Sequence, residues 1–299
     1  MTAPFADRLA AAAARTAPVV VGIDPRIERL PAPLREPLEG LSGLEWRVAA
    51  AEAVTAWSAA IIDAVAGTVP AVKPQAAFFE QLGAPGVAAL EATCRAARAA
   101  GLLVILDAKR GDIGSTAEAY ARATLDDDGP MAADAVTLSP YLGRDSVAPF
   151  LKRCDEQGKG LFVLVRTSNP GGADLQTRDD PAVAHRVAGW IRAWNDGRVG
   201  EHGYGPVGAV VGATVPAEAA ALRAAMPAAT LLVPGYGAQG GSAADTLPCF
   251  HDGGRGAIVN SSRGATLPAP EEVEAYDRDA RSVIRARAGR FAADISGLF

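Results

Sequence analysis

Short apolar runs alternate with longer amphipathic or alanine-rich segments along almost the whole chain. The apolar runs are rich in valine, leucine and isoleucine, which is typical of buried strands. We expect such strands at residues 18–23, 69–73, 102–108, 133–138, 161–165, 207–211, 230–233 and 257–260. The segments between them predict helices at residues 45–66, 87–100, 116–125, 144–154, 181–196, 217–225 and 243–251, followed by a long final helix around 271–288.

The alternation of strands and helices indicates the fold. It is typical of parallel strands joined by helical crossovers. Eight such units predict a (β/α)8 TIM barrel, and no change in composition marks a domain boundary, so we expect one domain over residues 1–299. An open, doubly wound sheet has the same local pattern, but the first crossover lacks its usual GxGxxG turn.

Two segments add to the eight units. Residues 5–15 are rich in alanine and predict a leading helix, and the proline-rich residues 25–42 form an insertion after the first strand. The sequence does not decide whether the leading helix packs on the bottom of the barrel or serves a contact between molecules.

Composition and charge exclude several classes of function. The net charge is −5 and no long basic stretch is present, so we expect no nucleic-acid partner. The three cysteines and three histidines are scattered, which indicates neither a disulfide framework nor a metal site. No apolar run approaches 18 residues, and residues 5–15 lack the apolar stretch of a signal peptide. We therefore expect a cytoplasmic protein without a membrane span.

Polar residues gather where the predicted strands end, which is where a TIM barrel carries its chemistry. Alternation along the third strand places Asp107 and Lys109 on the same face as Leu103 and Ile105, and Asp112 follows shortly after. Acidic neighbours hold a lysine protonated and oriented, ready to donate a proton. A solvated charged turn is the simpler interpretation of this segment alone. The other polar strand ends are Asp24, Lys73, 166–171, 234–241 and 260–264.

The last two of these loops predict a phosphate site. Phosphate sites in TIM barrels often use the loops after strands seven and eight, where glycines allow backbone amides to approach the anion. The glycine-rich residues 237–241 fit this pattern, with Gln239 as an amide donor. Arg263 follows the next strand, and its guanidinium matches the geometry of phosphate oxygens.

Six segments together resemble the orotidine 5′-monophosphate decarboxylase family, and in particular its longer bacterial subfamily. They occur in the family's order at the predicted strand ends: VGIDP (21–25), KPQAAFFE (73–80), DAKRGDIGST (107–116), TSNPG (167–171), PGYGAQGG (234–241) and NSSRG (260–264). The Asp-x-Lys-x-x-Asp core alone is shared with sugar-phosphate enzymes of the same superfamily. The six segments in order are much more specific.

The resemblance implies that the protein decarboxylates orotidine 5′-monophosphate to uridine 5′-monophosphate, the last step of de novo pyrimidine synthesis, without a metal or organic cofactor. Asp107 would lie beside the departing carboxylate, and Lys109 would protonate the carbanion left at C6 of the pyrimidine. Lys73 and Asp24 would bind the ribose hydroxyls and complete the charge network.

The same resemblance implies the remaining contacts. Asp112 and Thr116 would reach into the site of a neighbouring subunit, so the active unit would be a homodimer. Ser168, or a neighbour within residues 167–169, would contact the pyrimidine. Gln239 and Arg263 would hold the phosphate.

Two other functions remain open at this stage. One is a metal-dependent sugar-phosphate decarboxylase or aldolase, in which the acidic residues of the Asp-x-Lys-x-x-Asp group would bind magnesium. A chelator would stop that enzyme and leave a cofactor-independent one unaffected. The other is a barrel that binds a nucleotide phosphate without turning it over.

Overall fold

A computed structural model describes residues 3–237 and 240–299. Within them, eight parallel strands close into a barrel in the order β1 to β8, and β8 pairs with β1. The prediction of a (β/α)8 barrel is therefore confirmed, and the open sheet is excluded. Each strand lies within two residues of its expected position: β1 Val19–Ile23, β2 Ala71–Pro74, β3 Leu103–Arg110, β4 Ala135–Leu138, β5 Gly160–Arg166, β6 Val207–Val211, β7 Leu231–Val233 and β8 Ala257–Ser261.

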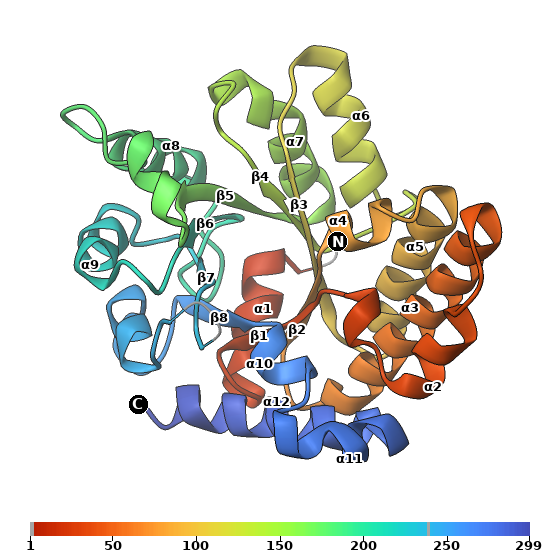
Figure 1. Ribbon diagram of the computed structural model, residues 1–299. Helices are drawn as coiled ribbons and strands as arrows, with labels where there is room; N and C mark the ends of the chain where they lie inside the picture. The colour runs from red at the N-terminus through yellow and green to blue at the C-terminus, as the bar shows by residue number, and fades with distance from the viewer. Residues whose placement is uncertain (1–2, 238–239) are drawn as a thin grey trace.

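The helices surround the barrel (Figure 1). The α-helices are α1 Phe5–Arg15, α2 Ala32–Arg35, α3 Gly43–Val65, α4 Ala76–Glu80, α5 Ala84–Ala99, α6 Gly114–Leu125, α7 Ala148–Gln157, α8 Val183–Asn195, α9 Pro216–Ala225, α10 Arg263–Thr266, α11 Val273–Arg278 and α12 Ala280–Ser296. The 3₁₀-helices are η1 Ile27–Arg29, η2 Glu36–Leu38, η3 Arg144–Val147, η4 Pro170–Asp174, η5 Ala244–Cys249 and η6 Pro270–Glu272.

Two of the expected helices differ in the structure. The final helix is not continuous, because Asp279 separates α11 from α12 and its carboxylate accepts a hydrogen bond from the Ser282 amide. A side chain that caps a new helix in this way favours a break over a continued helix. The segment after β7 forms the 3₁₀-helix η5, which contains Pro248. Proline lacks the amide hydrogen that an α-helix interior needs.

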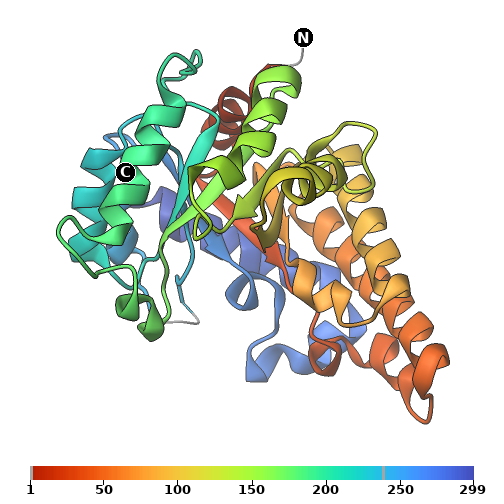
Figure 2. The same ribbon diagram turned by 90° about the horizontal axis from the view of Figure 1, so that it is seen from above.

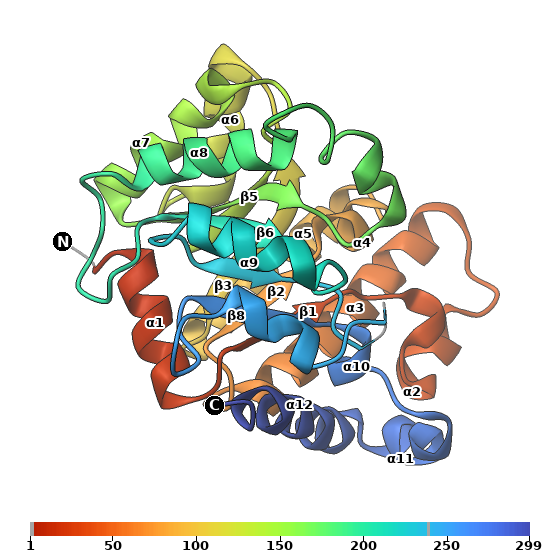
Figure 3. The ribbon, with the colours of Figure 1, turned by 90° about the vertical axis from the view of Figure 1, so that its left-hand side faces the viewer.

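The leading helix α1 closes the bottom of the barrel, which the sequence left undecided. Phe5 and Leu9 belong to the apolar cluster inside the barrel, and the Phe5 ring meets Phe162 edge-on at 6.0 Å between centroids. Arg8 forms an ion pair with Asp134, just before β4. Figures 2 and 3 show α1 at the end of the barrel that carries the N-terminus. Any cavity in the barrel must therefore open at the opposite end.

The insertion at residues 25–42 lies at that opposite end, since Figure 3 shows α2 on the side of the barrel away from α1. It folds into η1, α2 and η2, and it is anchored by the buried side chains of Leu30 and Leu38. A hydrogen bond from the Ala32 amide to the Asp277 carboxylate ties it to α11. The insertion is thus a packed part of the barrel's upper rim.

Helix α3 is the one described helix that is long and apolar enough to cross a membrane. In this structure 56% of its apolar window is buried, and the helix packs against α5 and α12 on the outside of the barrel. The core helices of soluble proteins can be equally long and apolar. The apolar character of α3 is therefore explained by its packing against neighbouring helices.

Candidate active site

A cavity of about 450 Å³ opens at the carboxyl ends of the strands. We call it the barrel-mouth cavity. Most of the polar strand ends singled out in the sequence line it, as the barrel geometry predicts. Its polar lining among the described residues is Asp24, Arg26, Lys73, Gln75, Asp107, Lys109, Thr137, Thr167, Ser168, Asn169, Tyr236, Asn260, Ser261, Ser262 and Arg263.

One carboxylate at the cavity floor is shared between two lysines. The Lys73 Nζ atom lies 2.5 Å from Oδ2 of Asp107, and the Lys109 Nζ atom lies 2.5 Å from Oδ1. Gln75 and Thr137 donate further hydrogen bonds to the same carboxylate, each at 3.0 Å. We call this group the Lys73–Asp107–Lys109 cluster. Both oxygens of Asp107 are thus occupied by cations and by neutral donors.

Burial and charge act in opposite directions on these groups. Burial alone would raise the pKa of Asp107, but Lys73 and Lys109 outweigh it and hold that pKa well below its usual range. Burial alone would lower the pKa of Lys73, whereas Asp107 and Asp24 outweigh it, so the pKa of Lys73 is raised. At neutral pH the floor of the cavity therefore carries fixed opposite charges in a poorly hydrated place.

The two lysines of this cluster differ in how far their side chains are exposed. Lys73 is almost completely buried, with 6% of its side chain exposed, whereas 45% of the Lys109 side chain is exposed. Both lysines line the cavity, and Lys109 is the one whose ammonium group is more accessible to a ligand. Its backbone has a φ of 48°, a left-handed conformation that is uncommon for a residue other than glycine.

The whole lining has an excess of positive charge. Among the described residues, the two carboxylates of Asp24 and Asp107 face four cationic side chains, those of Arg26, Lys73, Lys109 and Arg263. Three lining side chains also have a buried polar atom with no hydrogen-bond partner in the described part of the protein: Asp24 Oδ1, Arg26 Nε and Asn260 Oδ1. Buried polar groups are normally paired, so a ligand could complete these contacts: a hydroxyl group would donate to the Asp24 or Asn260 oxygen, and an anionic oxygen would accept from the Arg26 N–H group.

The loop after β5 holds Ser168 at the cavity wall. Arg166, at the end of the strand, is buried and forms two hydrogen bonds with the Glu218 carboxylate of α9. Thr214 donates a hydrogen bond to the Ser168 carbonyl. Gly212 permits the close approach, because a Cβ atom there would lie 2.9 Å from the Ser168 Cα. Ser168 is therefore placed by two neighbouring strand ends.

The loops after β7 and β8 form another part of the cavity wall, and Gly235 lies beside Ser168 of the β5 loop. Gly235 has a φ of 103°, which favours glycine. The Tyr236 hydroxyl donates to the Asp294 carboxylate, and its ring packs on Phe291 of α12 at 5.0 Å. Arg263 lines the cavity at the start of α10. Gln239, the other expected phosphate contact, lies outside the described residues.

Two expected site residues are not among those that line the cavity of this chain. Asp112 lies in the loop after β3, where its carboxylate accepts a hydrogen bond from the Ile113 amide. Thr116 is exposed in the first turn of α6.

Sequence reasoning gave no individual role to several polar residues of the cavity. Arg26 directly follows the first motif, Gln75 lies within the second, and Asn260 begins the last, so a signal was present for these three. Thr137 lies within an apolar strand, 1% exposed, and nothing in the sequence distinguished it from an ordinary core threonine.

Comparisons with known proteins agree with this geometry. The family model of the orotidine 5′-phosphate decarboxylase / HUMPS family matches residues 18–277. An orotidine 5′-phosphate decarboxylase of Rhodopirellula baltica is 52% identical over 266 residues, which cover 87% of each chain. That of Streptomyces coelicolor is 40% identical and covers 98% of this chain and 97% of its own.

Solved structures are similar over the same length. The crystal structure of a Streptomyces avermitilis protein has a TM-score of 0.79 and 39% identity, covering 99% of this chain and 96% of its own. The OMP decarboxylase of Leishmania donovani has a TM-score of 0.73 and 33% identity, covering 99% and 98%. The family model and these relatives match nearly the whole barrel. The chain therefore belongs to the orotidine 5′-phosphate decarboxylase / HUMPS family.

Proposed function

We propose that this protein decarboxylates orotidine 5′-monophosphate to uridine 5′-monophosphate and carbon dioxide, the last step of de novo pyrimidine synthesis. The observation that carries the proposal is the Lys73–Asp107–Lys109 cluster, in which one buried carboxylate lies between two ammonium groups at the floor of a cationic cavity. A substrate with a phosphate at one end and a carboxylate at the other suits this distribution of charge.

The substrate would lie in the cavity with each of its parts against a different group of loops. Its phosphate would lie at the loops after β7 and β8, held by Arg263 and Gln239. The pyrimidine would face the β5 loop and contact Ser168 or a neighbour within residues 167–169. The ribose hydroxyls would bind Asp24 and Lys73. In this orientation, C6 of the pyrimidine would lie over Asp107 and Lys109.

The chemistry then follows from the position of Lys109. The bond between C6 and the carboxylate breaks, carbon dioxide leaves, and the electron pair stays on C6. The Lys109 ammonium donates a proton to that pair, and a proton from water later restores the ammonium group. Asp107 lies beside the departing carboxylate and keeps Lys109 oriented through their 2.5 Å contact.

Proton donation alone is too weak to account for such a reaction. Decarboxylation at C6 offers no carbonyl group to accept the electron pair, so the barrier must fall by roughly 20 kcal/mol, near the upper end of the usual range. General acid catalysis contributes about 10²–10⁴-fold, or roughly 3–5 kcal/mol. Fixed charges at the cavity floor must supply most of the remainder. Binding of the distant phosphate can contribute by driving closure of the β7 loop.

We also propose that the active unit is a homodimer in which Asp112 and Thr116 complete the neighbouring site. Both lie outside their own chain's cavity lining. The loop that carries Asp112 lies beside the loop after β4, because the Ser139 amide bonds to the Arg110 carbonyl. Large apolar side chains are exposed on these two loops, namely Ile113 (57%), Tyr141 (78%) and Leu142 (47%). Exposed apolar surface next to a functional residue supports a subunit interface.

Mixing two inactive variants tests this shared site. Lys109→Ala and Asp112→Ala subunits, each inactive alone, should regain part of the activity when they are unfolded and refolded together. Each mixed dimer would contain one site with both residues intact. No recovery, with mixed dimers present by mass, would place Asp112 in its own subunit's site.

The proposed reaction needs neither a metal nor an organic cofactor, and we place it in the cytoplasm, with no nucleic acid or membrane as a partner. The test follows the absorbance of orotidine 5′-monophosphate with purified protein, with and without EDTA. Turnover that the chelator leaves unchanged supports the proposal. Turnover of a sugar phosphate that EDTA abolishes would support a metal-dependent enzyme. Tight binding of uridine 5′-monophosphate without turnover would indicate a binding protein.

A further inference from the structure

The strand that carries Asp107 and Lys109 is irregular at the point where the chemistry is placed. The pairing of β3 with β4 is regular up to Leu106 and resumes at Arg110 with a shifted register. Between these two residues the ladder is interrupted, and Lys109 adopts its φ of 48°. A left-handed backbone is strained for a residue other than glycine, so the surrounding structure must stabilise it.

The side chain of Thr137, on β4, occupies this interruption. Its Oγ1 atom accepts hydrogen bonds from the Ala108 amide at 3.0 Å and from the Lys109 amide at 2.9 Å. The same hydroxyl donates to Oδ1 of Asp107 at 3.0 Å. A hydroxyl has one hydrogen to donate and two lone pairs, so all its bonding capacity is used within the protein.

We propose that Thr137 is a positioning residue for the decarboxylation, which fixes the bulge in β3 and thereby sets the Lys109 ammonium against Asp107 and the substrate. The inference rests on the proposed function and extends it to a residue outside the six motifs. Thr137 acts through Lys109 and Asp107, because its hydroxyl has no remaining group for a substrate.

Burial makes this hydroxyl hard to replace. Thr137 is 1% exposed and Asp107 is 5% exposed, so water has little access to the place that the hydroxyl occupies. Valine has nearly the same shape but would leave the Ala108 and Lys109 amides without an acceptor. The bulge would then rearrange to pair them, and the Lys109 side chain would move with it. A displacement of 1 Å at a reacting group can cost about 100-fold in rate.

The experiment compares Thr137→Val, Thr137→Ser and a control, Thr93→Val. Thr93 is also a buried threonine whose hydroxyl bonds to a backbone carbonyl, but it lies on α5 outside the barrel. Wild-type and variant proteins are assayed with orotidine 5′-monophosphate for kcat and KM. Thermal unfolding is recorded for each, and the structure of Thr137→Val is determined.

We expect Thr137→Val to lower kcat by about 10- to 100-fold, with little change in KM, because it alters the position of Lys109 and leaves the phosphate contacts intact. Thr137→Ser keeps the hydroxyl and should retain most of kcat, and Thr93→Val should match the wild-type protein. In the Thr137→Val structure, Lys109 should leave its left-handed conformation. That result is independent of turnover.

Two results would overturn the inference. One is a Thr137→Val protein with wild-type kcat or with Lys109 unmoved. The other is a Thr137→Ser protein as impaired as Thr137→Val, which would assign the effect to the methyl group and its packing. If Thr137→Val does not fold, the kcat of Thr137→Ser decides between these readings. Failure of the proposed function is distinct, since the wild-type protein itself would then not turn over the substrate.

Discussion

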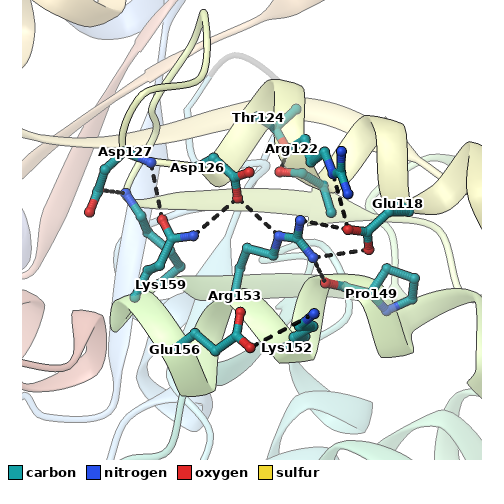
Figure 4. A network of polar contacts seen from close by, with 12 residues as sticks. Glu118, Arg122, Thr124, Asp126, Asp127, Pro149, Lys152, Arg153, Glu156 and Lys159 are labelled. Atoms are coloured by element: carbon teal, nitrogen blue, oxygen red, sulfur yellow. Dashed lines mark hydrogen bonds and ion pairs between the residues drawn. The ribbon is translucent and has the colours of Figure 1, made fainter.

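Two charge clusters in this barrel contain similar residues but have opposite characters. One is the Lys73–Asp107–Lys109 cluster at the barrel mouth. The other, which we call the Arg153 cluster, joins α6 to α7 and consists of Arg153, Glu118 and Asp126 (Figure 4). In the first cluster two cations share one carboxylate, whereas in the second one guanidinium is shared by two carboxylates.

The Arg153 cluster is complete within the protein. The guanidinium bonds to both oxygens of Glu118, at 2.7 and 2.9 Å, and to Asp126 at 2.9 Å. Only 6% of the Arg153 side chain is exposed, and the two carboxylates are partly exposed, so water can solvate their remaining lone pairs. Arg153 and Glu118 lie within regular helices, Asp126 directly follows α6, and none of the three lines the barrel-mouth cavity. This arrangement stabilises the packing of two helices.

The barrel-mouth cluster is incomplete without a ligand. It faces a cavity with an excess of cations, it includes a strained backbone at Lys109, and polar atoms nearby lack partners among the described residues. The comparison teaches that buried charge alone does not mark an active site. An active site is indicated more specifically by unbalanced charge that lies beside a cavity and on a strained backbone.

Removal of the Lys109 ammonium should have the largest effect on kcat and should distinguish the two clusters most clearly. We expect Lys109→Ala to lower kcat at least 100-fold, which is the low end of the contribution of general acid catalysis. The protein should fold normally, since nearly half of this side chain is exposed. Steady-state assays and circular dichroism measure both effects. A variant that keeps more than about a hundredth of kcat would remove Lys109 from the role of proton donor.

Neutralising the shared carboxylate should reduce stability as well as turnover. Asp107→Asn removes the carboxylate that pairs directly with the buried Lys73, and breaking a buried pair costs about 3–5 kcal/mol. The pKa of Asp107 is lowered in the folded protein, so its ion pairs stabilise the fold above the ordinary pKa of about 4 and this stabilisation is lost as the pH falls further.

The pH dependence checks this prediction. Urea unfolding of the wild-type protein and of Asp107→Asn should give a large difference in free energy at neutral pH and a smaller one in acid, where the wild-type carboxylate becomes protonated. A constant difference across this range would mean that the charge of Asp107 does not stabilise the fold.

Loss of the phosphate contact should have an intermediate effect. Arg263→Ala removes a charge-assisted interaction worth about 1.5–3 kcal/mol, so KM should rise about 10- to 100-fold. The value of kcat can fall as well if the phosphate drives loop closure. Wild-type kinetics in this variant would exclude Arg263 from the substrate site.

Disruption of the Arg153 cluster should affect stability alone. Arg153→Met leaves Asp126 without a cation and leaves Glu118 paired with Arg122 alone. Both carboxylates are partly exposed, so we expect a loss of about 1–2 kcal/mol, less than for a fully buried pair. The kcat of the folded protein should stay close to that of the wild-type protein. A fall in kcat comparable to that of Lys109→Ala would contradict the structural role assigned to this cluster.

The sequence predicted the barrel because each apolar run is short and each is followed by a helical segment. It predicted Asp107 and Lys109 because charged residues that follow an apolar strand stand out. It could not predict Thr137, since a threonine inside an apolar strand resembles any core residue, and its role depends on a shifted register between β3 and β4. The sequence also did not predict the helix break at Asp279. An aspartate in a helical pattern can be either an ordinary surface residue or an N-cap, and only the structure shows that Asp279 caps α12.

The most direct test of the barrel-mouth cluster is the fate of the substrate carboxylate. Orotidine 5′-monophosphate labelled with carbon-13 at that carboxylate is incubated in EDTA with the wild-type protein and with Lys109→Ala, and the products are followed by nuclear magnetic resonance. We predict labelled carbon dioxide and uridine 5′-monophosphate in equal amounts from the wild-type protein, and neither at a comparable rate from the variant. Release of labelled carbon dioxide by the variant at the wild-type rate would contradict a catalytic role for Lys109.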